Sequence, residues 1–291
     1  MKGIILAGGK GTRLAPVTFA VSKQLLPVSD KPLIYYPLSV LMLAEIKDIL
    51  IISMSQDIPH IRRLLGDGSH LGLRITYAEQ DEANGIAEAF IIGAEHIGND
   101  SVALVLGDNV FHGHSFQKIL HESVDDIEGC VLFSYPVRDP ERYGIGEVDD
   151  SGNLVKIVEK PVDPVTNRAI VGLYLYDNAV VDIAKNLRPS ERGELEITDI
   201  NQVYIERGQA RLVDFGRGFA WFDAGTPDAL FEASQYIQVI ERRQGVRVAC
   251  LEEIALRRGF ISLEDCLRNS EPMRGSAYGQ YVLSLGEGSP M

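Results

Sequence analysis

Short runs of apolar, often β-branched residues alternate with amphipathic stretches through the first two thirds of the chain. Most of these runs are almost unbroken in their apolar character, as expected of strands covered on both faces, and their alternation with helical patterns is typical of βαβ units in a parallel sheet. The runs that predict strands span residues 3–7, 49–53, 73–78 and 102–106. We therefore expect an α/β fold, a Rossmann-like mixed and mainly parallel sheet flanked by helices.

From about residue 129 the pattern changes to that of β-hairpins, which predicts an antiparallel insertion that closes over the sheet. The strand-like runs of this part are 130–135, 146–148 and 154–159. Helical periodicity returns at 179–187 and 195–207, and again after Thr226, which can cap a helix whose first turn holds Pro227. From about Gln244 onward the pattern predicts short helices and a polar tail.

Composition restricts the classes of partner. The chain has 291 residues, 41 of them acidic and 28 basic, and its net charge of −13 would repel nucleic acids and anionic membranes. Its 3 cysteines lack metal-ligand spacing, so we expect reduced thiols in a cytoplasmic protein. The apolar run at 3–7 is too short for a signal peptide, and no later run approaches the ~18 apolar residues of a membrane span.

The first predicted strand leads directly into the glycine-rich segment Ala7-Gly8-Gly9-Lys10-Gly11-Thr12-Arg13-Leu14. Its glycines leave backbone N–H groups unobstructed and Arg13 adds a planar cation, so the segment suits phosphate. A tight strand-to-helix turn with a solvated arginine is the alternative interpretation. The segment is not a Walker A loop, and it is not a dinucleotide-binding fingerprint, because Leu14 stands where a third glycine is needed. A nicotinamide oxidoreductase is therefore excluded.

A second motif, Ser22-Lys23-Gln24-Leu25-Leu26-Pro27, follows the glycine-rich segment. Together the two motifs resemble the signature of the nucleotidylyltransferase family that makes NDP-sugars, with Lys10 where a serine is more usual. Further motifs of that family follow in order along nearly the whole chain, and the set is similar to that of the thymidylyltransferases that act on glucose 1-phosphate. They are Asp30-Lys31-Pro32, Leu65-Gly66-Asp67-Gly68, Leu106-Gly107-Asp108-Asn109, Pro140-Glu141-Arg142-Tyr143-Gly144, Glu159-Lys160-Pro161, Gly193-Glu194-Leu195-Glu196-Ile197-Thr198-Asp199 and Trp221-Phe222-Asp223-Ala224-Gly225-Thr226.

The resemblance implies an enzyme that joins dTTP to α-D-glucose 1-phosphate, releases pyrophosphate and requires Mg²⁺. It also implies a homotetramer that a dTDP-sugar of its own pathway, such as the dTDP-rhamnose pathway, inhibits by feedback. Two alternatives stay open. One is a uridylyl- or cytidylyltransferase, or an enzyme for another hexose 1-phosphate. The other is a non-catalytic sugar-nucleotide-binding regulator, against which the intact candidate catalytic residues Arg13, Lys23, Asp108, Lys160 and Asp223 argue.

Two aspartates are the candidate metal ligands. Asp108 ends the apolar run at 102–106, and Asp223 follows an aromatic strand. Either one alone is more often a turn or capping residue. The resemblance implies that both hold Mg²⁺, a cation that suits hard carboxylate oxygens and completes its shell with water and substrate phosphates.

The resemblance also implies the residues that bind each substrate. For the nucleotide they are Gly8, Gly9, Gly11, Thr12, Arg13, Lys23, Gln24, Gln80 and Gly85. For the sugar phosphate they are Asn109, Tyr143, Gly144, Glu159, Lys160, Ile170, Val171 and Arg192. Without the resemblance, Glu159 and Lys160 would be a solvated pair at a strand end.

The segment that reads the base departs from the family pattern. Relatives have Gln-Pro-x-Pro-x-Gly-Leu-Ala-Gln-Ala, whereas this chain has Gln80-Asp81-Glu82-Ala83-Asn84-Gly85-Ile86-Ala87-Glu88-Ala89. Gln80 and Gly85 are kept, both prolines are lost, and Glu88 replaces a glutamine. Fewer prolines predict a less rigid loop. Thymine differs from uracil by one methyl group, worth about 1–3 kcal/mol in an apolar pocket, so we expect weak discrimination between them.

We expect a catalytic domain over residues 1–240, with a nucleotide-binding core at 1–128 and the sugar-binding insertion at about 129–225. The helical segment 241–291 is expected to form an oligomer or regulatory interface. There the sequence resembles the second nucleotide site of tetrameric thymidylyltransferases, although a surface helix with scattered charge is the simpler interpretation. The implied regulatory residues are His114, Arg217, Gly218, Glu253, Ile254 and Arg257.

Overall fold

The computed structural model describes residues 1–82, 84–125 and 127–287, so that Ala83 of the base-reading segment lies outside the described residues. The strands are β1 (Lys2–Leu6), β2 (Pro27–Val28), β3 (Lys31–Pro32), β4 (Asp48–Ser53), β5 (Arg74–Glu79), β6 (Val102–Leu106), β7 (Asn109–His112), β8 (Cys130–Pro136), β9 (Gly144–Val148), β10 (Leu154–Glu159), β11 (Arg168–Tyr176), β12 (Ala210–Asp214) and β13 (Ala220–Asp223). The helices are α1 (Tyr35–Leu43), α2 (Ile58–Leu65), α3 (Glu88–Ile92), α4 (Ala94–Ile97), α5 (Phe116–Val124), α6 (Val180–Asn186), α7 (Ile197–Glu206), α8 (Pro227–Gln244), α9 (Leu251–Arg257), α10 (Leu263–Ser270) and α11 (Ala277–Ser284).

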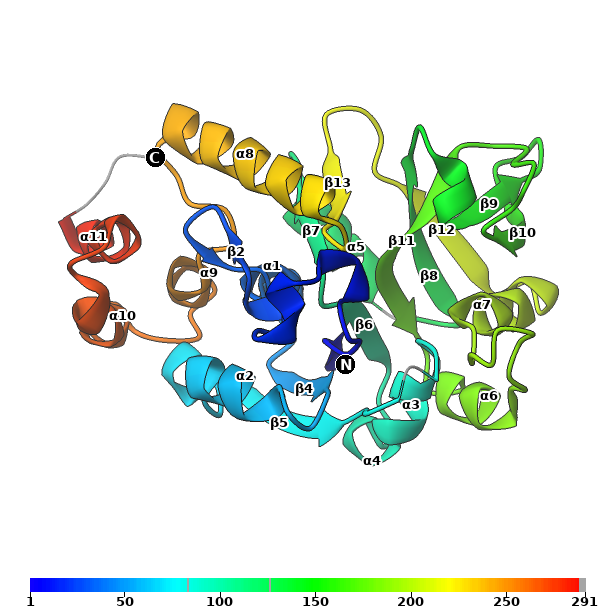
Figure 1. Cartoon of the computed structure of the whole chain (residues 1–291), viewed down its shortest axis with the longest axis horizontal. Helices are drawn as coiled ribbons and strands as arrows, with labels where there is room; N and C mark the ends of the chain where they lie inside the picture. Colours follow the sequence, from blue (N-terminus) through cyan, green and yellow to red (C-terminus); the bar gives the residue numbers. More distant parts are fainter. Residues whose placement is uncertain (83, 126, 288–291) are drawn as a thin grey trace.

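One mixed sheet runs through the molecule in the order β10-β9-β11-β6-β1-β4-β5, and β8 pairs with β11 and β12 beside this path (Figure 1). Strands β1, β4, β5 and β6 are parallel, and β11 joins β6 in the antiparallel direction. Ile4 and Ile5 of β1 are fully buried, as a strand covered on both faces requires. The α/β fold and its mainly parallel first half are therefore confirmed.

The second half confirms the antiparallel hairpin of β9 and β10. Its strands also extend the same sheet, because β11 pairs with β6, β8 and β9, and β12 is parallel to β8. The helix expected after Thr226 is α8, and the Thr226 hydroxyl accepts a hydrogen bond from the Ala229 N–H at 3.3 Å. That bond satisfies a backbone donor that the helix cannot pair internally.

The parallel strands place the motifs at one edge of the sheet. Leu6 of β1 is in register with Leu106 of β6, and Ser53 of β4 with Glu79 of β5. Because parallel strands end on the same side, the glycine-rich segment, Gln80 and Asp108 emerge at one edge, where ligands of open α/β sheets bind.

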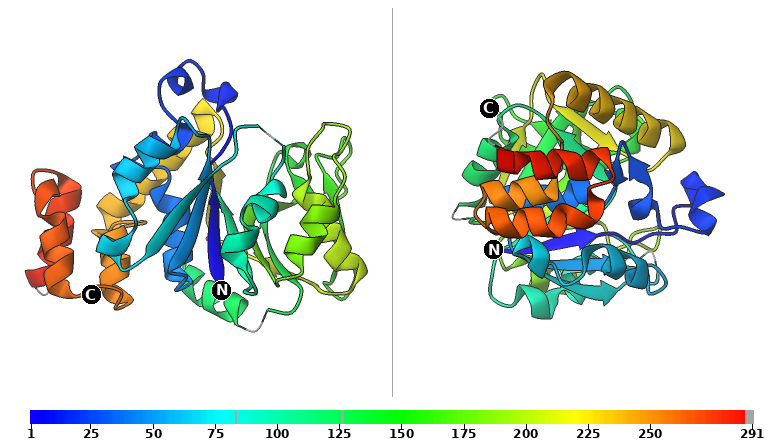
Figure 2. Two further views of the ribbon diagram at one scale, coloured as in Figure 1. Left: turned by 90° about the horizontal axis from the view of Figure 1, so that it is seen from below. Right: turned by 90° about the vertical axis from the view of Figure 1, so that its left-hand side faces the viewer.

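The C-terminal helices lie at one end of the long axis, and β9, β10 and α7 lie at the other (Figures 1 and 2). Cys250 and Cys266 belong to a small core with Tyr278 and Val282 that packs these helices together. All three cysteines are free and buried, and burial raises the pKa of the Cys130 thiol to about 12. The described residues contain no helix long and apolar enough to cross a membrane.

Candidate active site

The glycine-rich segment follows β1 and ends in a short 3-10 helix, Thr12–Leu14, after which two more 3-10 helices follow, Val17–Phe19 and Lys23–Leu25. Gly11 has a φ of 58°, which favours glycine, and its carbonyl accepts a hydrogen bond from the Thr18 hydroxyl at 2.8 Å. Gln24 is 1% exposed and donates to the Gly8 carbonyl at 3.4 Å, so it supports the loop from behind. Arg13 and Lys23 thus belong to the two ends of one compact loop.

Lys23 reaches across to Asp108, and its ammonium lies 2.6 Å from the Asp108 Oδ2 atom. Burial is the largest single effect and raises the pKa of Asp108, but the charge and hydrogen bond of Lys23, together with the hydrogen bond from Asn109, lower the pKa below its ordinary value. Asp108 is therefore held ionised. Sequence analysis could place both residues near phosphate, but their direct pairing across 85 positions is a result of the fold.

Asp223 is brought beside Asp108 by the pairing of β7 with β13, which sets Asp223 opposite Asn109, and by a hydrogen bond from the Ala224 N–H to the Asp108 carbonyl. Burial and the negative charge of Asp108 both raise the pKa of Asp223, and Arg13 acts in the opposite sense. A Cβ at Gly225 would lie 2.7 Å from the Arg13 guanidinium and 3.0 Å from Asp223, so Gly225 leaves room for their approach.

This pair of carboxylates fits a divalent cation. The two charges repel each other enough to raise a pKa, and a cation between them would remove that cost. In the described part of the chain no cluster of three or more His, Cys, Asp or Glu side chains could form an all-protein metal cage. Two aspartates with open positions for water and phosphate are the arrangement that Mg²⁺ prefers.

Asn109 connects the two halves of the site. Its amide nitrogen donates to Asp108 at 3.0 Å, and its oxygen accepts from the Gly172 N–H at 3.1 Å and from the Trp221 indole at 2.7 Å. The Trp221 ring meets the Tyr143 ring edge to face, with centroids 5.1 Å apart. Asn109 is among the sugar ligands expected from the sequence, whereas Trp221 is not, although it belongs to one of the family motifs.

Glu159 ends β10 and is the centre of a second polar cluster. Its carboxylate accepts from the Thr198 hydroxyl at 2.8 Å, and a Cβ at Gly144 would lie 3.1 Å from it. Lys160 has a left-handed backbone with a φ of 45°, a strained conformation for lysine that is typical of functional sites. Its N–H donates to the Tyr143 carbonyl at 3.0 Å, which joins the ends of β9 and β10. Thr198 was another residue that sequence analysis did not single out.

Arg192 faces the same cluster but is paired with carboxylates of its own segment. It lies 2.8 Å from Glu196, 3.5 Å from Glu194 and 3.8 Å from Glu159. Ile170 and Val171 of β11 are buried, so any contribution to sugar binding would come through their backbone or through packing.

Gln80 lies near the glycine-rich loop, and its amide nitrogen donates to the Gly85 carbonyl at 3.3 Å. A Cβ at Gly8 would be 3.0 Å from the Gln80 Oε1 atom, which places the Gln80 amide directly over that loop. Gly85 has a φ of 105° and packs against the Leu195 backbone, where a Cβ would lie 2.6 Å from the Leu195 nitrogen. This contact joins the segment expected to read the base, residues 80–89, to the segment that leads into α7. The sequence pattern did not predict it.

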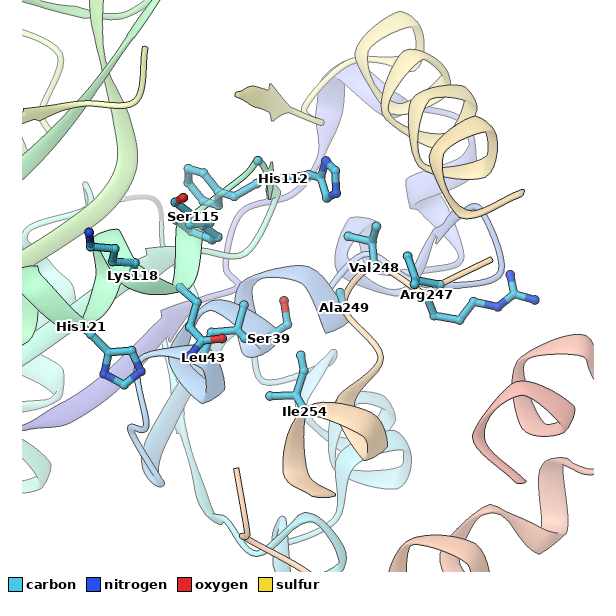
Figure 3. A pocket seen from close by; sticks show the side chains of 15 residues that line it. Ser39, Leu43, His112, Ser115, Lys118, His121, Arg247, Val248, Ala249 and Ile254 are labelled. Carbon is cyan, nitrogen blue, oxygen red and sulfur yellow. The ribbon is translucent and has the colours of Figure 1, made fainter. Parts of the chain in front are cut away.

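A cavity of about 730 Å³ lies between α1, β7, α5 and the segment that leads into α9 (Figure 3). Of the residues implied for a regulatory site, Ile254 lines it and His114 lies between the lining residues Gly113 and Ser115. Glu253 is buried and bonded to Arg257 and Tyr281, both at 2.7 Å. Arg217 and Gly218 are exposed on the loop before β13. Arg247 begins the segment 247–257 that resembles the regulatory site, whereas the basic lining residues Lys118 and His121 were not found from the sequence.

The fold and the paired aspartates define a nucleotidyltransferase, and the chain belongs to the nucleotidyl transferase family, whose model matches residues 2–239. It is 52% identical over 285 residues to the glucose-1-phosphate thymidylyltransferase of Neisseria gonorrhoeae, with 98% of this chain and 99% of that protein covered. It is 50% identical over 287 residues to the enzyme of the same name from Mycobacterium tuberculosis strain H37Rv, with 99% of each chain covered.

Solved structures agree with this family. The chain resembles a Bacillus anthracis protein described as a glucose-1-phosphate thymidylyltransferase and crystallised with sucrose, with a TM-score of 0.76 and 40% identity over 81% of this chain and 94% of that one. A UDP-glucose pyrophosphorylase bound to UDP-glucose shares the fold, with a TM-score of 0.71 and 24% identity over 82% of this chain and 98% of that one. The enzyme class expected from the sequence is confirmed.

Proposed function

We propose that the protein transfers a thymidylyl group from dTTP to α-D-glucose 1-phosphate and releases pyrophosphate. The observation that supports this most is the convergence of Arg13, Lys23, Asp108 and Asp223 at the carboxyl edge of the sheet, in a chain half identical to thymidylyltransferases along nearly its whole length. The test is pyrophosphate release when dTTP, glucose 1-phosphate and Mg²⁺ are mixed with the protein.

The chain's residues suit an in-line displacement. A phosphate oxygen of glucose 1-phosphate attacks the α-phosphorus of dTTP, the bond from that phosphorus to the β-phosphate bridging oxygen breaks, and pyrophosphate leaves. The nucleophile is already an anion, so the protein needs no strong base and acts by positioning the substrates and stabilising charge. Arg13 and Lys23 would hold the triphosphate, and Glu159, Lys160 and Arg192 the sugar phosphate.

Asp108 and Asp223 would hold Mg²⁺, which neutralises phosphate charge and aligns the reacting groups when bound. Lys23 bonds Asp108 in this structure, so the ammonium that would hold the triphosphate lies beside one of the two carboxylates that would hold the cation.

The base preference is the first testable consequence. We expect dTTP to be preferred over dUTP and UTP by about tenfold or less, at the low end of the ~1–3 kcal/mol that one methyl group is worth in an apolar pocket, because the loop that would read the base lacks both prolines and is less rigid. ATP and GTP should be poor substrates, because a purine would not fit a pocket sized for a pyrimidine. A matrix of nucleoside triphosphates against hexose 1-phosphates, scored by kcat/KM, measures this. A purine preference would contradict the role of Gln80 and Gly85, and a matrix with no turnover would favour a non-catalytic regulator.

The cavity of Figure 3 is a candidate regulatory site for an anionic ligand. The chain carries a net charge of −13, yet the described lining residues include Lys118, His121 and Arg247 and none that is acidic. The carboxylates near these cations lie outside the lining and would have to share them with an anionic ligand; they are Glu122, Glu45, Asp30 and Glu241. Ser115 and Ala249 of the lining have left-handed backbones with φ of 63° and 53°, strain of the kind found at ligand sites. We propose that a dTDP-sugar binds here, in a homotetramer, with His114, Arg217, Gly218, Glu253, Ile254 and Arg257 around it.

If this site is functional, dTDP-rhamnose should inhibit without competing with dTTP, and the coupling should be reciprocal. Lys118→Ala should weaken inhibition by about tenfold through loss of one charged contact, and Arg257→Ala should weaken it as well. The inhibition constant of each variant is compared with that of Arg63→Ala, which removes an exposed charge on α2. Purely competitive inhibition, or the same inhibition constant in all variants, would show that the cavity has no such role.

A further inference from the structure

The Gln80 side-chain amide is held in one orientation. Its nitrogen donates to a Glu88 carboxylate oxygen at 2.6 Å and to the Gly85 carbonyl at 3.3 Å. Both partners are acceptors only. If the amide were reversed, its oxygen would face a carboxylate oxygen at hydrogen-bond distance, which is repulsive. The amide nitrogen therefore faces Glu88, and the amide oxygen faces the opposite way.

The Gln80 amide oxygen points toward the glycine-rich loop. Gln80 directly follows β5, and its backbone N–H donates to the Ser53 carbonyl at 2.9 Å, which fixes the start of the side chain. Its Oε1 atom faces Gly8, where a Cβ would lie at 3.0 Å. Gln80 thus presents a hydrogen-bond acceptor beside the glycine-rich loop, at the carboxyl edge of the sheet.

Glu88 is itself firmly placed. Its other carboxylate oxygen accepts from the Asn84 amide at 2.9 Å. The backbone on its N-terminal side is hydrogen-bonded to the segment that leads into α7. The Leu195 N–H donates to the Asn84 carbonyl at 2.6 Å, and the Leu195 carbonyl accepts from the Ala87 N–H at 3.2 Å. Ala87 and Ala89, on either side of Glu88, are fully buried. The carboxylate therefore has little freedom to move away from Gln80.

We propose that Glu88 is a positioning residue for base selection, which turns the Gln80 acceptor toward the ring N3–H group of thymine or uracil. This inference rests on the proposed function. Cytosine has an unprotonated acceptor nitrogen at that ring position, so it would meet the Gln80 oxygen with like polarity and is rejected. The charge-assisted hydrogen bond from Gln80 to Glu88 also polarises the amide and strengthens its oxygen as an acceptor.

A carboxylate does this better than the glutamine that the family pattern has at the same position. A carboxylate cannot donate a hydrogen bond, so it accepts only the orientation in which the Gln80 nitrogen faces it. A glutamine could rotate its own amide and donate to the Gln80 oxygen. The pair could then turn together and offer the base either a donor or an acceptor. The charge of Glu88 removes that second arrangement.

The experiment compares kcat/KM for dTTP and dCTP, with glucose 1-phosphate, in the full-length enzyme and in Glu88→Gln. We expect the dTTP-to-dCTP ratio to fall by about tenfold, through a higher KM for dTTP and an unchanged kcat. Glu79→Gln is the matched control, because it removes an exposed carboxylate from the residue before Gln80 and should leave the ratio unchanged. A loss of structural support alone would lower the rate with both nucleotides equally and would overturn the proposal.

The Gln80→Ala background sharpens the test. If Glu88 acts through Gln80, Glu88→Gln should have no further effect on the ratio once Gln80 is absent. A tenfold effect that persists in Gln80→Ala would contradict the mechanism. If the unmodified enzyme releases no pyrophosphate from dTTP and glucose 1-phosphate, the proposed function fails first. If it turns over dTTP and Glu88→Gln leaves the ratio unchanged, only the inference about Glu88 fails.

Discussion

Asp108→Asn and Asp223→Asn are each expected to lower kcat at saturating Mg²⁺ by about a hundredfold or more, the effect of removing one electrostatic group aimed at the reacting phosphates. Each substitution keeps the size of the side chain but removes a charge from the pair that would hold the cation. The measurement is the rate of pyrophosphate release over a range of Mg²⁺ concentrations. Asp228→Asn, which removes an exposed charge from the first turn of α8, should leave kcat nearly unchanged.

The same two variants should change stability in opposite directions. The pKa of Asp108 is lowered in the folded protein, so its ionised form stabilises the fold at neutral pH, and this stability is lost as pH falls through the folded pKa. The pKa of Asp223 is raised, so above that pKa its charge reduces the free energy of unfolding. In EDTA at neutral pH, Asp108→Asn should lower Tm, and Asp223→Asn should leave it the same or raise it. A near-normal kcat in either variant, or a lower Tm for Asp223→Asn, would contradict this assignment of the pair.

Arg13→Ala is expected to reduce kcat/KM by about 10²–10³-fold, because it removes a preorganised cation beside the site of charge development. The Arg13 guanidinium lies next to Gly225 and Asp223, in position to contact a phosphate and the metal-holding carboxylate together. Arg13→Lys should recover only part of the loss, because an ammonium lacks the planar two-pronged donor geometry of arginine. Initial rates with varied dTTP measure both variants.

Arg63→Ala serves as the control for Arg13 as well, because it removes one positive charge from the exposed face of α2. If its effect matches that of Arg13→Ala, the cause is the general electrostatic field of the protein rather than a contact with substrate. Full recovery in Arg13→Lys would show that a point charge is sufficient and that the fork geometry has no role.

Local patterns were sufficient for most of the parallel half of the fold. Nearly unbroken apolar runs coincide with β1, β4 and β6, because a strand buried on two sides needs apolar residues on both faces, whereas β5 lies at the edge of the sheet and exposes Arg74, Thr76 and Glu79. The cap at Thr226 was equally local, since the hydroxyl and the N–H group it accepts from are three residues apart. The glycine-rich segment was recognisable for the same reason, because its chemistry is contiguous in the chain.

The strands of the second half of the chain were harder to predict from the sequence. The nine-residue strand β11 was missed, although it joins β6 to the hairpin strands, because its run is followed by a helix and carries no hairpin signal toward β6. Short strands such as β7 and β13 pair across more than 100 residues, and only that pairing sets Asn109 opposite Asp223. No short stretch of sequence contains both strands of such a pair.

The sequence by itself determined the class of fold, and its contiguous motifs predicted a loop suited to phosphate and the candidate catalytic residues. Only the tertiary structure decided which of them meet. Lys23 pairs with Asp108, Glu253 is turned inward to Tyr281, and Glu88 orients Gln80. The physical reason is that the pKa of a carboxylate and the orientation of an amide depend on neighbours that long-range packing supplies, whereas burial periodicity and turn chemistry act within a few residues of the chain.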